Sequence, residues 1–256
     1  MNALRGCWRL AKALGVGLAG WVTIVFVFPR LSVLQRHKHV QGWAQHMLQV
    51  LGIVLQVRGD ADARGPLLLV ANHISWLDIL VIHAARHCRF VSKSDVKAWP
   101  LIGRLATGGG TLYIERESRR DAMRVVHRMA DSLRSGEILA VFPEGTTSEG
   151  LSILPFHGNL IQAAISAGAP AQPVALRFVD ADSRETSLTP AYIGEDSLLD
   201  SLWRTVSGAP LIALVDFGVP QYADGRDRRR WAQDLRAAVD ALRQGEPSAA
   251  ARGPGD

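Results

Sequence analysis

A histidine and an aspartate stand five residues apart in the stretch LLLVANHISWLDIL, just after an apolar run from Leu67 to Ala71 ends. A carboxylate that holds one imidazole nitrogen leaves the other nitrogen free to accept a proton, as in enzymes that use an oriented general base. His73 and Asp78 therefore predict a general-base pair, provided that the chain can bring them together. No G-x-S-x-G elbow occurs in the chain, so the pattern does not indicate a serine nucleophile.

The spacing of this pair requires a helix that starts late. Positions five apart on one helix differ by about 140° around its axis, so His73 has to precede the helix that holds Asp78. Ser75 is a natural N-cap for a helix that begins at Trp76, which leaves the imidazole on the preceding turn. The same Ser-x-x-Asp spacing is that of a capping box, so the alternative is that Asp78 only satisfies backbone donors.

A second polar group follows another apolar run, in LAVFPEGTTSEG. Glu144, Gly145 and Thr146 come directly after the predicted strand. Thr147 and Ser148 add two further hydroxyls. A glycine beside hydroxyls and free backbone amides can cradle an anion or a polar head group. The alternative is an ordinary turn, since Pro-Glu-Gly is not distinctive by itself.

A third candidate is Arg116, which lies in TLYIERESRR just beyond an apolar run. Charge clusters of this kind are usually solvated helix starts. At a strand end, however, a guanidinium can bind a phosphate or a carboxylate through two parallel hydrogen bonds. Arg116 is therefore a candidate anion-binding residue.

Short apolar runs alternate with helical stretches beyond Arg58, which predicts an α/β fold with a mixed, largely parallel sheet flanked by helices. The predicted strands are 67–71, 89–92, 111–114, 138–142, 172–179 and 211–217. The predicted helices are 76–85, 100–106, 119–133, 158–167 and 228–243. Ligands of open α/β sheets bind outside the carboxyl ends of strands, so the three polar groups are expected at one edge of the sheet.

The N-terminal part is apolar and lies between basic residues. From Ala13 to Phe28 no residue is charged, but this run is slightly shorter than the roughly 20 residues that cross a bilayer. No small-x-small cleavage site follows it, so a cleaved signal peptide is not indicated. The stretch from Val40 to Val57 has apolar residues at helical spacing. We expect an N-terminal pair of membrane-embedding helices, partly sunk in one leaflet.

The chain is expected to comprise membrane-associating helices (1–57), an α/β domain (58–245) and a disordered tail (246–256). Lys and Arg exceed Asp and Glu by 29 to 24, a net charge of +5 that suits an anionic membrane surface or nucleic acid. No nucleic-acid recognition pattern accompanies the charge, so nucleic acid is not expected as a partner. His83 and His87 lack the glutamate of H-E-x-x-H, and neither a metal site nor a cofactor is expected.

Four blocks occur in a fixed order: NHISWLD (72–78), GTLYIER (110–116), FPEGTTS (142–148) and QPVAL (172–176). Together they resemble the glycerolipid acyltransferases, in particular the 1-acylglycerol-3-phosphate acyltransferase family with its H-x-x-x-x-D motif. The likeness covers about residues 65–180, and the apolar segments before it resemble the membrane-embedding helices of that family. The resemblance makes the general-base pair the leading interpretation of the first block.

The resemblance implies an O-acyltransferase of phospholipid synthesis. Its members move a fatty acyl chain from acyl-ACP or acyl-CoA to the free hydroxyl of a lysophospholipid, here 1-acylglycerol-3-phosphate, to form phosphatidic acid. By this carry-over His73 takes the hydroxyl proton while Asp78 holds the ring. The expected location is the membrane surface at the cytoplasmic face of the inner (plasma) membrane, where thioester donors are made.

The same resemblance assigns the acceptor head group to several polar residues. The residues implied are Lys93, Arg116, Glu144, Gly145 and Thr146. Lys93 belongs to SKSDVKAWPLIG, which resembles the family's stretch after the first block.

The chain departs from the family's pattern at two positions. Thr147 stands where an arginine commonly follows FPEGT, and His157 stands where a lysine often follows Pro-Phe. A missing guanidinium removes a charge-assisted contact with phosphate. The alternative acceptors are therefore a lyso-ornithine lipid, which carries no phosphate, and other lysophospholipids. A lipid-binding membrane protein without turnover is the non-enzymatic alternative, but binding alone would not need a base.

Overall fold

Strands and helices alternate along the chain as the sequence predicts. The strands are β1 (Ile53–Arg58), β2 (Leu67–Ala71), β3 (Arg89–Lys93), β4 (Leu112–Ile114), β5 (Ile138–Val141), β6 (Ala171–Asp180) and β7 (Leu211–Phe217). The helices are α1 (Asn2–Val22), α2 (Val33–Leu51), α3 (Leu77–Ala85), α4 (Ile102–Gly108), α5 (Arg119–Arg134), α6 (Gly158–Ala167), α7 (Leu198–Ser207) and α8 (Arg228–Gln244). This computed structural model describes residues 2–114 and 119–245, and the tail 246–256 lies outside them.

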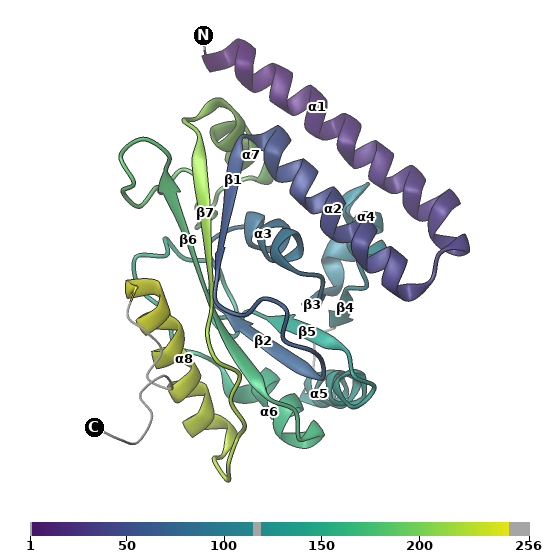
Figure 1. Ribbon diagram of the computed structural model, residues 1–256, viewed down its shortest axis with the longest axis vertical. Helices are drawn as coiled ribbons and strands as arrows, with labels where there is room; N and C mark the ends of the chain where they lie inside the picture. The colour runs from purple at the N-terminus through teal and green to yellow at the C-terminus, as the bar shows by residue number, and fades with distance from the viewer. Residues whose placement is uncertain (1, 115–118, 246–256) are drawn as a thin grey trace.

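The strands form one sheet in the order β1-β7-β6-β2-β5-β3-β4 (Figure 1). Every adjacent pair is parallel except β6 with β7. The predicted mixed, largely parallel sheet flanked by helices is thus confirmed.

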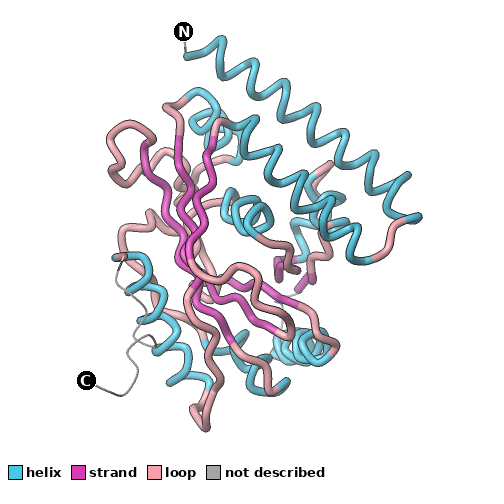
Figure 2. The backbone as a smooth tube through the Cα atoms, in the orientation of Figure 1, coloured by secondary structure: helices cyan, strands magenta, loops and turns pink. Residues whose placement is uncertain are grey.

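The core has two layers because the central strand is buried on both faces. Leu67, Leu69 and Ala71 of β2 pack with α2 and α3. The alternate residues Leu68 and Val70 pack on the other face with α5, α6 and α8. Figure 2 shows the strands between these two groups of helices. A strand enclosed in this way reads as a continuous apolar run, which is why β2 is recognisable from the sequence.

The parallel strands β2, β5, β3 and β4 bring their carboxyl ends to one edge of the sheet. Val70 is in register with Val141, so the segments that follow β2 and β5 emerge side by side. Asn72 fixes the start of the first segment: its amide donates to the Leu176 carbonyl over 3.1 Å and accepts from the Leu176 N–H over 2.8 Å. This side chain continues the β2–β6 ladder for one more step.

The N-terminal residues form the predicted pair of helices, and α1 and α2 lie side by side and antiparallel (Figure 1). The indole of Trp43 on α2 donates to the carbonyl of Val16 on α1 over 2.9 Å. Gly20 permits this close approach, because a Cβ at that position would lie 2.6 Å from the indole nitrogen. At its other end α1 contacts α7, where Arg5 donates to the carbonyl of Gly208 over 2.9 Å.

The helix predicted from Val40 to Val57 is wrong at both ends, since α2 begins earlier, at Val33 after its N-cap Ser32, and also ends earlier. Gly52 takes a left-handed conformation, with φ +80°, and ends α2 at Leu51. The residues after it form β1, which pairs with β7. The apolar spacing of α2 runs on into the strand, so periodicity alone could not find the junction. Helix α7, preceded by its N-cap Ser197, was not predicted.

Candidate active site

His73 and Asp78 meet at the carboxyl end of β2. The imidazole Nδ1 lies 2.7 Å from Oδ2 of Asp78. A carboxylate can only accept, so in the neutral ring Nδ1 carries the proton and Nε2 is left as the basic nitrogen. Within the described residues Nε2 makes no hydrogen bond. As expected, His73 lies on the turn before α3. The helix itself starts at Leu77, one residue later than predicted, and its N-cap is Trp76 and not Ser75.

The Asp78 carboxylate also has the capping role that was its alternative interpretation. Its Oδ2 accepts from the backbone N–H of Ile74 over 2.6 Å and from that of Ser75 over 2.9 Å. The Asp78 side chain is fully buried, whereas that of His73 remains 20% exposed. One carboxylate therefore shapes the turn and orients the imidazole at once, and the two interpretations are not exclusive.

The ring of His73 is held on its face as well as at its edge. It stacks on the ring of Phe142, the first residue after β5, with centroids 4.0 Å apart and planes 9° apart. Phe142 in turn stacks on Phe90 of β3 at 5.8 Å. The imidazole is thus fixed by two neighbouring strands and the Asp78 carboxylate, while Nε2 stays reachable from outside.

Glu144 lies in the turn after β5 and is buried, with 4% exposure. Burial, with a smaller contribution from the nearby Asp78 charge, raises the pKa of this carboxyl to about 8. The His73 N–H and the Ser148 hydroxyl oppose the rise, but neither carboxyl oxygen has a full hydrogen bond within the described residues. Glu144 is therefore protonated at neutral pH and is able to donate a hydrogen bond.

The rest of this turn is open to solvent. Gly145 and Thr146 are exposed, and Gly145 has a φ of +75° that other residues rarely adopt. The imidazole of His157 would lie 3.5 Å from a Cβ at Gly145, so it flanks the turn. The Gly145 N–H already donates to the carbonyl of Phe142 over 3.1 Å. The polar groups of exposed Thr146 are thus the ones that a ligand could approach.

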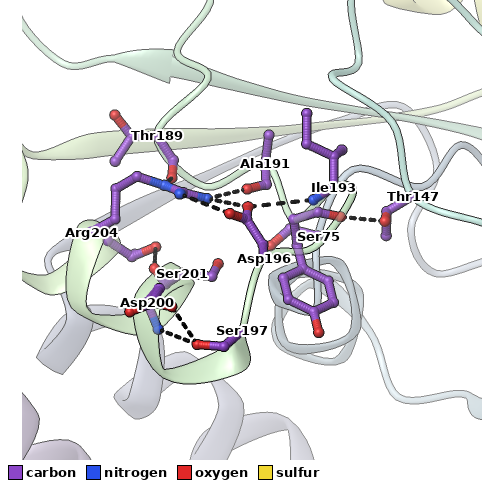
Figure 3. Close-up of polar contacts among 12 residues, drawn as sticks. Ser75, Thr147, Thr189, Ala191, Ile193, Asp196, Ser197, Asp200, Ser201 and Arg204 are labelled. Atoms are coloured by element: carbon purple, nitrogen blue, oxygen red, sulfur yellow. Dashed lines mark hydrogen bonds and ion pairs between the residues drawn. The ribbon is translucent and has the colours of Figure 1, made fainter.

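The turn is joined directly to the His73 loop. The backbone N–H of Ser148 donates to the carbonyl of His73 over 2.9 Å. The hydroxyl of Thr147 donates to the carbonyl of Tyr192, a residue of the segment between β6 and α7 (Figure 3). Thr147 therefore uses its hydroxyl within the protein.

The two predicted cationic residues are located only in part. The backbone of Lys93 ends β3 in register with Ile114, at the same edge as His73 and Glu144. The Lys93 side chain lies outside what the structure describes. Arg116 also lies outside the described residues, beyond the end of β4.

Several residues at the site were not predicted. Asn72 anchors the His73 loop to β6, and Tyr192 contacts both polar loops. The indole of Trp76 donates to the hydroxyl of Ser201 on α7 over 3.1 Å. Asn72 had a signal, since it directly precedes the histidine after a strand. No sequence signal indicated Tyr192 or Ser201, because their roles depend on contacts with residues distant in sequence.

In the described part of the chain, no cluster of His, Cys, Asp or Glu has the geometry of a metal site. His83 and His87 are stacked with centroids 5.6 Å apart.

Comparisons with known proteins agree with this architecture. A family model described as Acyltransferase matches residues 53–177. The crystal structure of the 1-acyl-sn-glycerophosphate (LPA) acyltransferase PlsC from Thermotoga maritima matches with a TM-score of 0.67, covering 96% of this chain and 100% of that one. Its sequence is 18% identical, so this likeness concerns the fold alone.

Relatives with higher identity cover most of the chain. A lyso-ornithine lipid O-acyltransferase of Pseudomonas aeruginosa is 38% identical over 228 residues, which are 89% of this chain and 87% of that relative. A 1-acyl-sn-glycerol-3-phosphate acyltransferase of Neisseria gonorrhoeae is 35% identical over 209 residues, 81% of each protein. The expected family is thus confirmed, and the chain belongs to the acyltransferase family as an O-acyltransferase.

Proposed function

We propose that this acyltransferase moves a fatty acyl chain from acyl-ACP or acyl-CoA to the free hydroxyl of 1-acylglycerol-3-phosphate, forming phosphatidic acid. The observation that carries the proposal is the His73–Asp78 pair, with Nδ1 held at 2.7 Å and the ring partly exposed. The name of the Neisseria gonorrhoeae relative supports this acceptor.

In the proposed reaction Nε2 of His73 accepts the proton of the acceptor hydroxyl. The oxygen attacks the thioester carbonyl, the carbon–sulfur bond breaks, and the departing thiolate takes up the proton from the imidazolium. Asp78 stabilises the imidazolium while it is charged and holds the ring in place. Such assistance typically contributes about 10²- to 10⁴-fold, and the remaining acceleration comes from holding both substrates in position.

The acceptor head group is proposed to bind at the same edge of the sheet. Gly145 and Thr146 are exposed there, and Thr146 contributes a hydroxyl. The protonated Glu144 carboxyl, whose two oxygens are buried in this structure, is proposed as one further donor. Lys93 and Arg116 are the proposed cationic partners of a phosphate.

Membrane association at the cytoplasmic face of the inner (plasma) membrane is part of the proposal. The helical stretch Ala3–Arg30 is long and apolar enough to cross a membrane by length and composition. Its outward side exposes a row of large apolar side chains that continues onto the start of α2: Leu4, Trp8, Leu14, Leu18, Val22, Phe26, Val33 and Leu34. Lipid would remove this surface from water, which favours a helical pair lying on or in one leaflet.

A lyso-ornithine lipid is the second candidate acceptor, and one contact favours it. The Thr147 hydroxyl is bonded to the carbonyl of Tyr192, so position 147 offers a phosphate neither a guanidinium nor a free hydroxyl. The name of the Pseudomonas aeruginosa relative agrees with such an acceptor.

The proposal is tested by offering the purified protein 1-acylglycerol-3-phosphate, lyso-ornithine lipid and other lysophospholipids, each with labelled acyl-ACP and acyl-CoA. We expect product from 1-acylglycerol-3-phosphate, and a preference for lyso-ornithine lipid would select the second candidate. His73→Ala should lower turnover by about 10²-fold or more without changing the melting temperature appreciably. Turnover of this variant within tenfold of wild type would remove His73 from the mechanism.

A further inference from the structure

The segment Thr189–Asp196, between β6 and α7, borders both polar loops of the candidate site. The backbone N–H of Tyr192 donates to the carbonyl of Ile74 over 3.1 Å, and Ile74 directly follows His73. The carbonyl of the same tyrosine accepts from the hydroxyl of Thr147, in the turn after β5 (Figure 3). A single residue of this segment is thus bonded to both loops.

These contacts close a ring of hydrogen bonds. The His73 and Ser148 backbones are joined directly over 2.9 Å, and their chain neighbours Ile74 and Thr147 are joined through Tyr192. A closed ring restricts the two loops more than either link alone, because neither loop can shift without breaking a bond. The distance between the His73 ring and the Glu144 turn therefore depends on where Tyr192 is held.

Arg204 of α7 holds the 189–196 segment (Figure 3). Its Nε donates to the carbonyl of Thr189 over 2.9 Å, and its Nη2 donates to the carbonyl of Ala191 over 2.6 Å. The same Nη2 lies 2.8 Å from Oδ2 of Asp196, near the end of the segment. A planar guanidinium reaches these three acceptors from two separate nitrogens in a fixed fork, whereas a lysine presents its donors from a single nitrogen.

We propose that Arg204 is a positioning residue for the acceptor: by clamping the 189–196 segment, it sets through Tyr192 the separation between the His73 base and the Glu144 turn. The inference rests on the proposed function, in which the turn binds the acceptor head group and His73 reaches its hydroxyl. A lipid held at both points requires that separation to be fixed, since small misplacements of reacting groups are costly. The thioester donor is not held between the two loops in this scheme, so its binding is independent of the clamp.

The test compares Arg204→Ala and Arg204→Lys with Arg134→Ala as a matched control. Arg134 also bonds a carboxylate, that of Asp131, and a backbone carbonyl, that of Ser166, but it lies at the end of α5 that precedes β5. For Arg204→Ala we expect the acceptor KM to rise about tenfold, consistent with the loss of one to two hydrogen bonds, while the donor KM stays within about twofold. Arg204→Lys should be intermediate, and Arg134→Ala should leave both KM values unchanged.

Thr147→Val provides a second variant that keeps the clamp but opens the ring. Loss of this single bond should raise the acceptor KM about fivefold without changing the donor KM. The inference is overturned if Thr147→Val leaves the acceptor KM unchanged, or if Arg204→Ala lowers kcat and raises both KM values together, as a general loss of structure would. If wild-type protein acylates no lysolipid, the proposed function fails. If wild type is active and Arg204→Ala matches the Arg134→Ala control, only the clamp fails.

Discussion

One carboxylate oxygen of Asp78 both holds the turn before α3 and orients the imidazole of His73. Oδ2 of Asp78 accepts from the Ile74 and Ser75 backbones and from the imidazole of His73, all within 2.9 Å. The charge of a carboxylate makes each of these bonds stronger than one to a neutral amide. Because the turn and the imidazole share this acceptor, a substitution of Asp78 that keeps its size changes the orientation of the base more than it changes packing.

Asp78→Asn tests this arrangement. An amide of the same shape still offers one oxygen to the backbone donors, but it does not stabilise the imidazolium and no longer fixes which ring nitrogen is protonated. We expect kcat to fall about 10²-fold or more, with the melting temperature lowered by only a few degrees. Asp131→Asn, on an exposed carboxylate of α5, is the control. A kcat within tenfold of wild type would show that the carboxylate serves only the turn.

Glu144 makes the stability of the protein depend on pH. The folded protein keeps the Glu144 proton up to a pH of about 8, whereas an exposed glutamate loses it near 4.5. Between these values the folded state binds more protons than the unfolded state, so the free energy of unfolding falls as pH rises. Glu144→Gln removes this titration.

The expected result is that wild-type protein loses about 3 °C or more in melting temperature relative to Glu144→Gln between pH 5.5 and 8. Thermal unfolding of the two proteins across this range measures the difference. Parallel curves would mean that the carboxyl is already ionised in the folded protein at pH 5.5.

At the scale of elements, the sequence predicts best what depends on local pattern. Strand β7 and helix α6 have the bounds predicted for them, since each has an apolar pattern typical of one kind of element and clear flanking residues. Strand β1 was hidden because the apolar spacing of α2 continues into it, and only the conformation of Gly52 separates the two. Helix α7 was missed although Ser197 and Asp200 give it an N-terminal signal.

The candidate site follows the same division. His73 and Glu144 were predicted because each follows a strand closely, and parallel strands share an edge. Asp78 was predicted from its spacing to His73. The ring through Tyr192 was not, because Thr147 is 45 residues away in sequence and the contact uses a backbone carbonyl. Such contacts depend on the position that α7 gives to the preceding segment, and no pattern of residue types predicts them.

A stack of histidines joins α2 to the segment after α3. The rings of His37 and His87 lie 3.8 Å apart with planes 20° apart, and His83 lies beyond them. Burial, together with the charges of neighbouring histidines and arginines, lowers the pKa of His87 to about 3. The charged groups that act on His87 are His37, His83, Arg89 and Arg86. Those that act on His37 are Glu137 and Arg89.

This stack should make the α2–α3 junction sensitive to acid. Below the ordinary histidine pKa of 6.5, His87 is protonated in the unfolded chain but stays neutral in the folded protein. The free energy of unfolding therefore falls as pH decreases. His87→Gln should therefore lose less melting temperature than wild type between pH 7 and 5. His127→Gln, on the exposed side of α5, should behave like wild type. Equal losses for His87→Gln and wild type would contradict the role of the stack.

At the scale of the whole molecule, α1 is attached to the domain along its full length. Near its start Arg9 donates to the carbonyl of Val206 at the end of α7 over 3.2 Å. Near its end the guanidinium of Arg104 on α4 lies over the Trp21 ring, 5.4 Å from its centre. A helix with both ends on one domain lies along that domain's surface. Under the proposed membrane association, its outward apolar side faces the bilayer while the helix lies in the membrane plane.

An N-terminal epitope tag distinguishes this orientation from a helix that crosses the membrane. In inverted membrane vesicles, whose cytoplasmic face is outside, an in-plane α1 leaves the tag on the outer side with the domain. We expect added protease to remove the N-terminal tag and a C-terminal control tag at similar rates. A spanning helix would instead hold the N-terminal tag inside the vesicle, protected until detergent is added. That protection would require α1 to detach from α7 and α4, because both contacts cannot persist across a hydrocarbon core of about 30 Å.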